Sequence, residues 1–389
     1  MNTINESQSD PAEELKQRLA LLRDSARQYA GNAAHLKRAR ALRGTRPGHD
    51  AVVWREMAAL GWTGTMLPEQ YGGTGLGCAE MATICEALGR SLLPEPVTAA
   101  AVLAGGAILY GDNEALKAKL LPALASGDLL PSLAWREDTH ATNILAVAAR
   151  AEASASGVRL SGAKRLIVGG AGADGFVVSA QQHGGLALYW VPLAAVGPRL
   201  VFHDLPDGRP AADLELDGIE VPAANRIAGP GVAELALARA YDEALIMTAA
   251  ELHGLSTRTL EITTEYLRTR VQFGKPIGSF QALQHQAANL YIQHRLCQHA
   301  LQEVVTLLQQ PGVDENVRGA LASRIKARCA DASLRITRTA VQMHGAMGFA
   351  DECDVGMYLR RAVTLAAWLG GADVHRRRYA RLALTEIAA

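Results

Sequence analysis

The sequence predicts an α+β fold in three parts: an N-terminal α-helical domain (residues 1–128), a middle antiparallel β-barrel domain (129–231) and a C-terminal four-helix-bundle domain (232–389). Three observations lead to this prediction. A chain of 389 residues is too long for one ordinary hydrophobic core. Apolar residues recur at helical spacing toward both ends of the chain. Short apolar runs between turn residues occupy the middle.

The first part of the chain has the pattern of amphipathic helices. Leu15, Leu19 and Leu22 recur at the spacing of one helical face. Asp50 stands just before a second periodic segment, where an aspartate caps the free N–H groups of a helix start. Helices are therefore expected at Ala12–Tyr29, His49–Leu60, Ala79–Leu93, Val97–Tyr110 and Asn113–Ala125.

The middle part consists of short β-like runs separated by glycines. Strands are expected at Val158–Leu160, Arg165–Val168, Gly175–Ser179, Leu186–Val191 and Asp213–Leu216. No helical pattern separates them, which favours an antiparallel barrel or sandwich over a βαβ domain. One GxGxxG sequence occurs at Gly170–Gly175, but a strand follows it instead of the helix start that would hold a pyrophosphate. We interpret these glycines as turn residues.

The last part returns to the helical period and keeps it to the end of the chain. Long segments with few helix breakers are expected as helices at Ala233–Arg270, Phe280–Gln310, Val313–Gly345 and Asp373–Ile387. Helices of this length pack as a bundle.

Several function classes are disfavoured by composition. Lys+Arg and Asp+Glu are both 39, so no charge excess recruits nucleic acid or an anionic membrane. The five cysteines lack CxxC spacing and read as reduced thiols, and the stretch Met1–Lys16 lacks the features of a signal peptide. His285, His294 and His299 are not at the i,i+4 spacing of a shared metal. We expect a cytoplasmic protein without a membrane span or metal site.

The most informative segment is Tyr266–His285. The pattern predicts a long helix ending at Phe273-Gly274, a turn containing proline, and a new helix that Ser279 would cap. A basic residue close to this break, Arg270, and a glutamine in the first turn of the next helix, Gln281, are placed where they could meet a phosphate. Taken alone, the segment is equally typical of an ordinary helix–turn–helix.

Four motifs in the same order resemble the acyl-CoA dehydrogenase family. The pattern Arg270-x-Gln-Phe-Gly-Lys-Pro-Ile-x-x-Phe-Gln281 is similar to the family's signature. Leu67–Gly77 resembles its loop before the third helix, and Leu160–Gly170 its strand pair in the middle domain. Gln342-Met-His-Gly-Ala-Met-Gly-Phe349 resembles its Gln-x-x-Gly-Gly-x-Gly-aromatic motif. The resemblance covers about residues 10 to 385.

The resemblance implies that FAD lies extended between two subunits. Its pyrophosphate and adenine half would be bound by Arg270, Phe273, Gln281, Gln342 and Gly345. An arginine fork suits a diphosphate, and glycine lets a backbone amide approach it closely. This half of the family's cofactor site is retained, with Ala346 replacing the second glycine of the last motif as a mild departure.

The flavin-ring half departs from the family pattern. Ala134–Ala141 stands where members usually carry Thr-Glu-Pro-x-x-Gly-Ser-Asp. The usual Trp-x-Thr is Leu166-Ile-Val168, so an aromatic residue that packs on the ring and a hydroxyl near it are both missing. Compared with the family pattern, this chain therefore lacks two side chains that support the flavin ring.

The position of the family's catalytic base also differs from the family pattern. The family's reaction needs a carboxylate against the α-carbon of the thioester, in a dry pocket where its basicity rises. The usual Glu-Gly pair aligns with Leu369-Gly370. Some members use a glutamate on the helix before the Arg270 motif, and that position aligns with Ala244. Glu243 is one residue away, and a single-residue bulge would bring it to the right face, so it is the candidate catalytic base.

Other residues near Glu243 are candidates for the same pocket. Tyr241 and Asp242 are candidate substrate-binding residues, and Asp242 matches a family position near the CoA moiety. Glu251 lies seven residues past Ala244 on the same helical face and is a second candidate base. The alternatives are that both glutamates form salt bridges on a bundle helix, and that this chain holds no base.

The C-terminal pattern Tyr358-Leu-Arg-Arg…Leu369-Gly-Gly-Ala-Asp373 resembles small subunits of pimeloyl-CoA dehydrogenases and subunits of heteromeric steroid side-chain dehydrogenases. The small residues of Thr98–Gly106 suit a bulky or wide acyl group, and the resemblance implies a steroid-derived or dicarboxylic one. We expect an FAD-dependent acyl-CoA dehydrogenase that introduces an α,β double bond and passes electrons to an electron-transferring flavoprotein. It would form a homodimer or homotetramer, or a heterotetramer with a second dehydrogenase subunit.

Two other hypotheses stay open. The chain could be a non-catalytic subunit that completes the FAD site of a heteromeric dehydrogenase. More remotely, the same fold could support an oxidase or monooxygenase.

Overall fold

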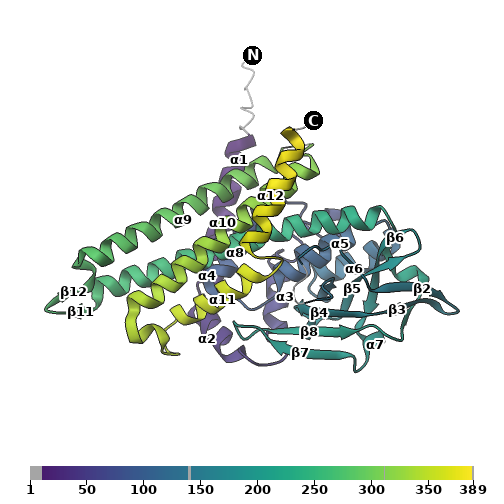
Figure 1. Cartoon of the computed structure of the whole chain (residues 1–389), viewed down its shortest axis with the longest axis horizontal. Helices are drawn as coiled ribbons and strands as arrows, with labels where there is room; N and C mark the ends of the chain where they lie inside the picture. The colour runs from purple at the N-terminus through teal and green to yellow at the C-terminus, as the bar shows by residue number, and fades with distance from the viewer. Residues whose placement is uncertain (1–10, 139–141, 311, 388–389) are drawn as a thin grey trace, which may run out of the picture.

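The computed structural model describes residues 11–138, 142–310 and 312–387. The three-part α+β fold is confirmed: strands gather at one end of the molecule, and the long helices run across it (Figure 1). Residues 1–10 and 139–141 lie outside the described part, so the signal-peptide expectation and the end of Ala134–Ala141 have no structural counterpart here. Within the described residues, no helix has the length and apolar composition needed to cross a membrane.

The N-terminal helices form where apolar periodicity predicts them. Asp50 caps its helix as expected, because its carboxylate accepts a hydrogen bond from the backbone N–H of Val52 at 2.9 Å. The segment expected as one helix at Val97–Tyr110 instead begins as a π-helix, which is rare and often found at functional sites. The helices are α1 (Pro11–Ala30), α2 (Ala33–Leu42), α3 (Ala51–Ala59), α4 (Cys78–Ser91), the π-helix (Thr98–Ala104), α5 (Gly105–Leu109) and α6 (Glu114–Ala125).

The middle domain has two separate sheets, which corresponds to the sandwich alternative better than to a closed barrel. The first sheet has the order β10-β6-β5-β2-β3-β9 with β1 added on β5, and the second has the order β4-β8-β7. The strands are β1 (Pro131–Ala134), β2 (Arg150–Ser154), β3 (Gly157–Ser161), β4 (Ala163–Val168), β5 (Gly175–Gln182), β6 (Gly185–Pro192), β7 (Leu200–Asp204), β8 (Pro210–Glu215), β9 (Ile219–Val221) and β10 (Arg226–Ala228). A short helix, α7 (Leu193–Val196), follows β6.

Two pairings correct the expectation of a wholly antiparallel domain. Both β1 and β2 pair with β5 in parallel, with Ser132 opposite Phe176 in the first pair. Parallel neighbours need a crossover connection, and here the chain passes through intervening strands before it returns as β5. The interpretation of the GxGxxG sequence holds, because Gly170–Gly172 forms a single 3-10 turn and Gly175 begins β5.

The C-terminal helices confirm the predicted bundle and add one helix that was not expected. Ser279 does not cap a helix as predicted: its hydroxyl donates to the carbonyl of Pro276 at 2.7 Å, and the next helix begins at Gln281 with Phe280 as its cap residue. The elements are α8 (Val232–Thr269), the hairpin β11 (Val271–Gln272) and β12 (Lys275–Pro276), α9 (Gln281–Leu307), α10 (Glu315–His344), α11 (Val355–Ala367, not predicted) and α12 (Ala372–Ile387).

Helix α8 joins the helical domains because glycines let α4 approach it closely. A Cβ added at Gly89 would lie 2.1 Å from the carbonyl oxygen of Glu251, and one at Gly254 would lie 1.9 Å from that of Glu86. Any larger residue at these two positions would push the helices apart.

A buried ion cluster joins the β domain to the bundle. Asp207, in the turn between β7 and β8, pairs with Arg361 of α11 at 2.8 Å and with Arg209 at 2.7 Å. Arg361 also donates to the backbone carbonyl of Leu93 at 3.1 Å. The three domains therefore meet at one charged junction.

Candidate functional site

The five residues expected to bind the cofactor's pyrophosphate and adenine half lie at one end of the bundle. Arg270 ends α8, Gln281 begins α9, and Gln342 and Gly345 lie at the end of α10. Phe273 lies in the β11–β12 hairpin that marks this end in Figure 1. The antiparallel course of the three helices brings these residues together.

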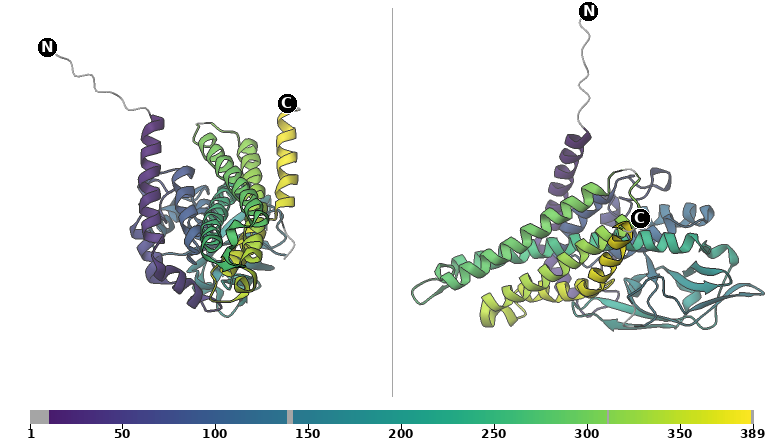
Figure 2. Two further views of the ribbon diagram at one scale, coloured as in Figure 1. Left: turned by 90° about the vertical axis from the view of Figure 1, so that its left-hand side faces the viewer. Right: turned by 45° about the horizontal axis from the view of Figure 1, so that its top comes forward.

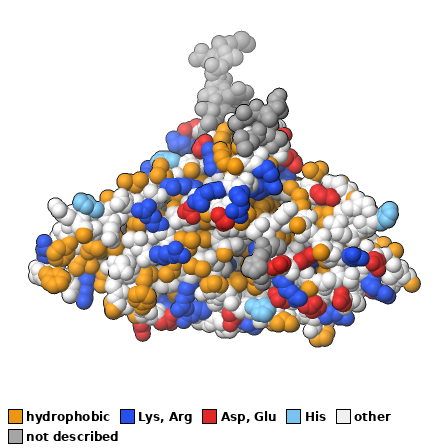
Figure 3. All heavy atoms as spheres, in the orientation of Figure 1, with side chains coloured by type: hydrophobic (Ala, Val, Ile, Leu, Met, Phe, Trp, Pro, Cys, Tyr) orange, Lys and Arg blue, Asp and Glu red, His pale blue; other side chains and the backbone are white. Residues whose placement is uncertain are grey.

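This end of the bundle is exposed and partly apolar. The side chain of Phe273 is 91% exposed, and that of Phe349 is 83% exposed. Val271 in the hairpin and Met347 after α10 are also exposed large apolar residues, and Tyr291, Ile292 and Leu296 continue the exposed apolar side chains along α9. Figure 3 shows hydrophobic side chains at the left end of the visible face, over the hairpin and the adjoining helix ends. An exposed apolar patch of this kind marks a contact with another molecule.

The polar groups at this end suit a phosphate. The guanidinium of Arg270 has no hydrogen bond or ion pair with any residue in the described part of the chain. Gly345 has a φ of 61°, and open space surrounds the position that a Cβ would take, so its backbone is accessible. These residues therefore fit the diphosphate half of FAD.

The region expected to hold the flavin ring and the acyl group is filled by side chains. The end of β1, strand β4, the π-helix and the turn after α11 converge there around a cavity of only about 10 Å³. That volume accommodates one water molecule at most. The lining residues are Ala99, Leu103, Leu133, Trp135, Arg165, Leu166, Ile167, Val168 and Trp368. As arranged here, they do not fit a flavin ring.

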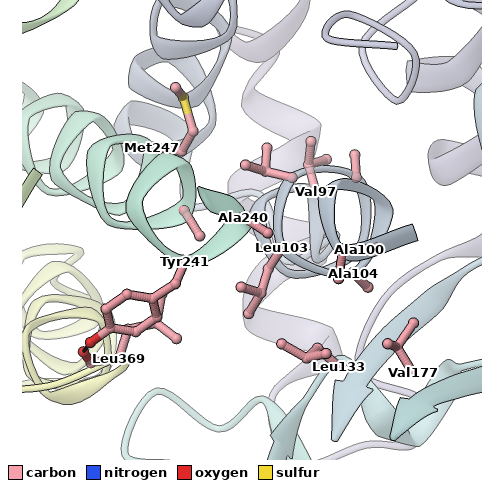
Figure 4. Packing of buried hydrophobic residues seen from close by; sticks show 14 of the residues in the cluster. Val97, Ala100, Leu103, Ala104, Leu133, Val177, Ala240, Tyr241, Met247 and Leu369 are labelled. Atoms are coloured by element: carbon pink, nitrogen blue, oxygen red, sulfur yellow. Dashed lines mark hydrogen bonds between the residues drawn. The ribbon is translucent and has the colours of Figure 1, made fainter. Parts of the chain in front are cut away.

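Tyr241, a candidate substrate-binding residue, occupies the place beside the missing base. Its ring points toward Leu369, and its hydroxyl donates to the Leu369 carbonyl (Figure 4). The ring Nε2 of His375 lies 3.1 Å from the same carbonyl oxygen. Lys326 donates to the carbonyl of Gly370 at 3.1 Å, and burial lowers the pKa of this lysine to about 7. Tyr241, His375 and Lys326 thus hold the turn at Leu369-Gly370 in place through contacts with its backbone carbonyls.

Glu243 has its carboxylate engaged on the α5 side of α8. The hydroxyl of Tyr110 donates to both carboxylate oxygens, at 2.7 and 2.9 Å, and Arg239 lies 3.4 Å away. Burial raises the pKa of Glu243, against the opposing effects of Tyr110 and Arg239. Helix α8 is continuous from Val232 to Thr269 without a bulge, so Glu243 stays about 100° around the helix from Ala244.

Glu251 lies two turns deeper than Ala244, on the same face of α8. It accepts a hydrogen bond from the hydroxyl of Thr98 in the π-helix at 2.5 Å. Burial raises its pKa, against the effect of Thr98. The carboxylate is therefore a buried acid next to the wall of small residues that the sequence placed at the acyl pocket.

Asp242 faces a separate open cavity of about 570 Å³ between α8, α10, α12 and residues 142–145. Its carboxylate pairs with Arg378 at 2.6 Å, and burial raises its pKa despite this partner. The cavity is lined by five arginines: Arg239, Arg318, Arg377, Arg378 and Arg381. Figure 3 shows basic side chains gathered over α12 in the middle of the visible face. This arginine group was not predicted, although the consecutive arginines 376–378 were a signal for it in the sequence.

Comparisons with known proteins agree with the motifs. Residues 16–128 match the acyl-CoA dehydrogenase N-terminal domain, and residues 235–384 match the acyl-CoA dehydrogenase C-terminal domain. The chain is 30% identical to acyl-CoA dehydrogenase FadE27 of Mycobacterium tuberculosis, over 85% of this chain and 88% of the relative.

Two solved structures are similar over nearly the whole chain. One is a variant of the Tcur3481-Tcur3483 steroid ACAD, with a TM-score of 0.84, 29% identity and coverage of 96% of this chain and 100% of the other. The other is the ChsE4-ChsE5 complex from Mycobacterium tuberculosis, with a TM-score of 0.81, 26% identity and coverage of 93% and 96%.

Proposed function

The chain belongs to the acyl-CoA dehydrogenase family, and we propose that it is the subunit that completes a flavin site held mainly by a second, unlike dehydrogenase chain. Members of the family are FAD-dependent oxidoreductases, and a similar glutaryl-CoA dehydrogenase from Mycobacterium smegmatis was solved with FADH2. The bound flavin supplies the acceptor for the hydride that leaves the β-carbon of the acyl group.

One observation carries this proposal: the two halves of the family's flavin site differ within this chain. The residues that we assign to the phosphates around Arg270 are exposed, whereas a cavity of only about 10 Å³ remains among the residues expected around the ring. Leu369 stands where the base is expected, and its carbonyl is occupied by Tyr241. A chain with this combination can contribute to a neighbour's flavin but lacks a ring site of its own.

The chain's own residues have defined roles in this proposal. The free guanidinium of Arg270 would hold the pyrophosphate, because an arginine fork suits a diphosphate. Gln281, Gln342 and the accessible backbone at Gly345 would hold the same half of the cofactor. Phe273 in the hairpin would support the adenine half. The second chain provides the ring pocket and the carboxylate that removes the α-proton.

The nature of the substrate is also part of the proposal. Similarity to a steroid dehydrogenase and to the ChsE4-ChsE5 complex supports a bulky, steroid-derived acyl-CoA and a heterotetramer. An electron-transferring flavoprotein is the proposed electron acceptor. The arginine-lined cavity beside Asp242 has the charge to receive the phosphates of a CoA moiety.

The visible absorption spectrum tests the proposal. Purified alone and incubated with FAD, the chain should show no bound-flavin absorbance after desalting. Isolated from its own cells with its partner chain, it should carry flavin and oxidise acyl-CoA. A chain that binds flavin stoichiometrically by itself and turns over an acyl-CoA would exclude the shared-site proposal.

A complete homomeric enzyme with Glu243 as base is the second candidate, favoured by the raised pKa of this buried carboxyl. Under the shared-site proposal, Glu243→Gln should change turnover of the active complex by less than about twofold, because glutamine still accepts the Tyr110 hydrogen bond. General-base loss would cost about 100-fold or more. The rate of flavin reduction in a stopped-flow experiment distinguishes these two outcomes for Glu243→Gln. Glu251→Gln, at the other buried glutamate of α8, is measured in the same way for comparison.

A further inference from the structure

A groove of about 710 Å³ lies between α1, α4 and α9, outside the flavin region. Its walls are apolar: Leu15 and Leu19 come from α1, and Leu301 and Val305 from α9. The α4 side contributes the small residues Ala79 and Ala82, which leave room between the walls. Figure 2 (left) shows α1 standing beside the bundle helices. Mostly apolar clefts of this size are typical of small-molecule sites.

The inner end of the groove carries a buried imidazole without a hydrogen bond. His253 lines the groove and is 3% exposed, and neither ring nitrogen has a hydrogen-bond partner among the described residues. Its Nδ1 lies 3.7 Å from a carboxylate oxygen of Glu86, and its ring stacks on His294 with centroids 4.7 Å apart. Glu86 faces Nδ1, which leaves Nε2 without a polar partner; an unsatisfied buried polar group is costly, so an outside oxygen that bonded Nε2 would be favoured.

The rim of the groove is basic. Lys16, Arg23 and Arg27 are spaced so that they share one face of α1, and all three line the groove. Glu86 is the one carboxylate among the described lining residues. Burial alone would raise the pKa of Glu86, but His253 and Arg27 lower it to about 2. The rim therefore has a positive excess that attracts an anion.

We propose that this groove binds an amphipathic carboxylate, with its apolar chain between α1 and α9 and its carboxylate at Lys16 and Arg23. The far end of the ligand's apolar chain reaches His253, whose ring bonds an oxygen atom at that end of the ligand. Arg27 lies eleven positions after Lys16, about 16 Å along the helix, and contacts Glu86, which faces His253. A chain of roughly 12 carbons has a similar length. A ligand with a terminal hydroxyl, such as an ω-hydroxy acid, meets both the basic rim and the unpaired nitrogen of His253.

Titration calorimetry on the chain alone tests the site, with dodecanoate and 12-hydroxydodecanoate below their micelle concentrations as probes. We expect saturable binding at one site, with the hydroxy acid about tenfold tighter. His253→Phe should abolish the difference between the probes. Arg23→Gln should weaken both acids several-fold but not dodecanol. Arg55→Gln on α3, which does not line the groove, is the matched control.

Two variants close the groove sterically. Ala82→Leu fills its α4 side, and Val305→Phe narrows it from the partly exposed α9 wall, so the second variant serves if the first does not fold. Either should weaken dodecanoate binding at least tenfold. Absence of saturable binding, or binding unchanged in a folded Val305→Phe protein, would overturn the proposal; equal affinity for dodecanol would overturn the anionic ligand. The test needs neither flavin nor partner, so its failure leaves the shared flavin site untouched.

Discussion

Replacing Asp207 with alanine is expected to lower the free energy of unfolding by about 3–5 kcal/mol, because one partner of a buried ion pair is removed. The variant leaves Arg361, which is 5% exposed, without its carboxylate at the junction of the three domains. Arg209 loses the same partner. Urea unfolding followed by circular dichroism measures the change.

Asp204→Ala is the matched control for this prediction. Asp204 pairs with Arg46 at 2.6 Å on the surface, with both side chains more than one third exposed, and such pairs contribute less than about 1 kcal/mol. Equal effects of the two variants would contradict the structural role given to Asp207.

The effect of Asp207 should also depend on pH. Although burial alone would raise the pKa of Asp207, Arg209 and Arg361 hold it below its ordinary value of 3.8. The pair therefore stabilises the fold above that value, and the contribution is lost as the pH falls through the lowered pKa. In acid unfolding experiments, the stability of Asp207→Ala should therefore lack this pH-dependent contribution.

The second large effect is expected for Arg270→Ala in the isolated complex. A charge-assisted hydrogen bond contributes about 1.5–3 kcal/mol, so loss of the Arg270 contact should weaken FAD retention by about 10- to 150-fold. Released flavin is measured by fluorescence after dilution. The activity lost should return with excess FAD, because the catalytic groups are unchanged.

Arg268→Ala supplies the control for Arg270. It removes an exposed arginine two residues earlier, in the last turn of α8. It should leave FAD affinity within about twofold of the unchanged protein. If Arg270→Ala kept its flavin as well as Arg268→Ala, Arg270 would have no place in the cofactor site.

Periodicity was sufficient to predict most elements of this fold. Apolar spacing of 3.6 identified the long helices α8, α9 and α10, and short apolar runs between turn residues identified β3, β4, β5, β6 and β8 but not β1, β2, β7, β9 or β10. Periodicity gave wrong predictions where the backbone geometry depends on contacts with distant segments of the chain. The π-helix Thr98–Ala104 and the parallel pairing of β1 with β5 are examples. Ser279 failed as a cap because its hydroxyl closes a turn on Pro276 instead.

The sequence by itself determined the family and led to the residues proposed for the exposed half of the flavin site, because a motif specifies residue types. Only the tertiary structure decided what surrounds the buried candidate residues. Tyr241 and Leu369 meet from segments 128 residues apart, and Glu243 meets Tyr110 from 133 residues away. Burial, ion pairing and cavity volume arise from such contacts between distant segments. For that reason the filled ring region, the α12 arginines and the groove at His253 become visible only in the folded chain.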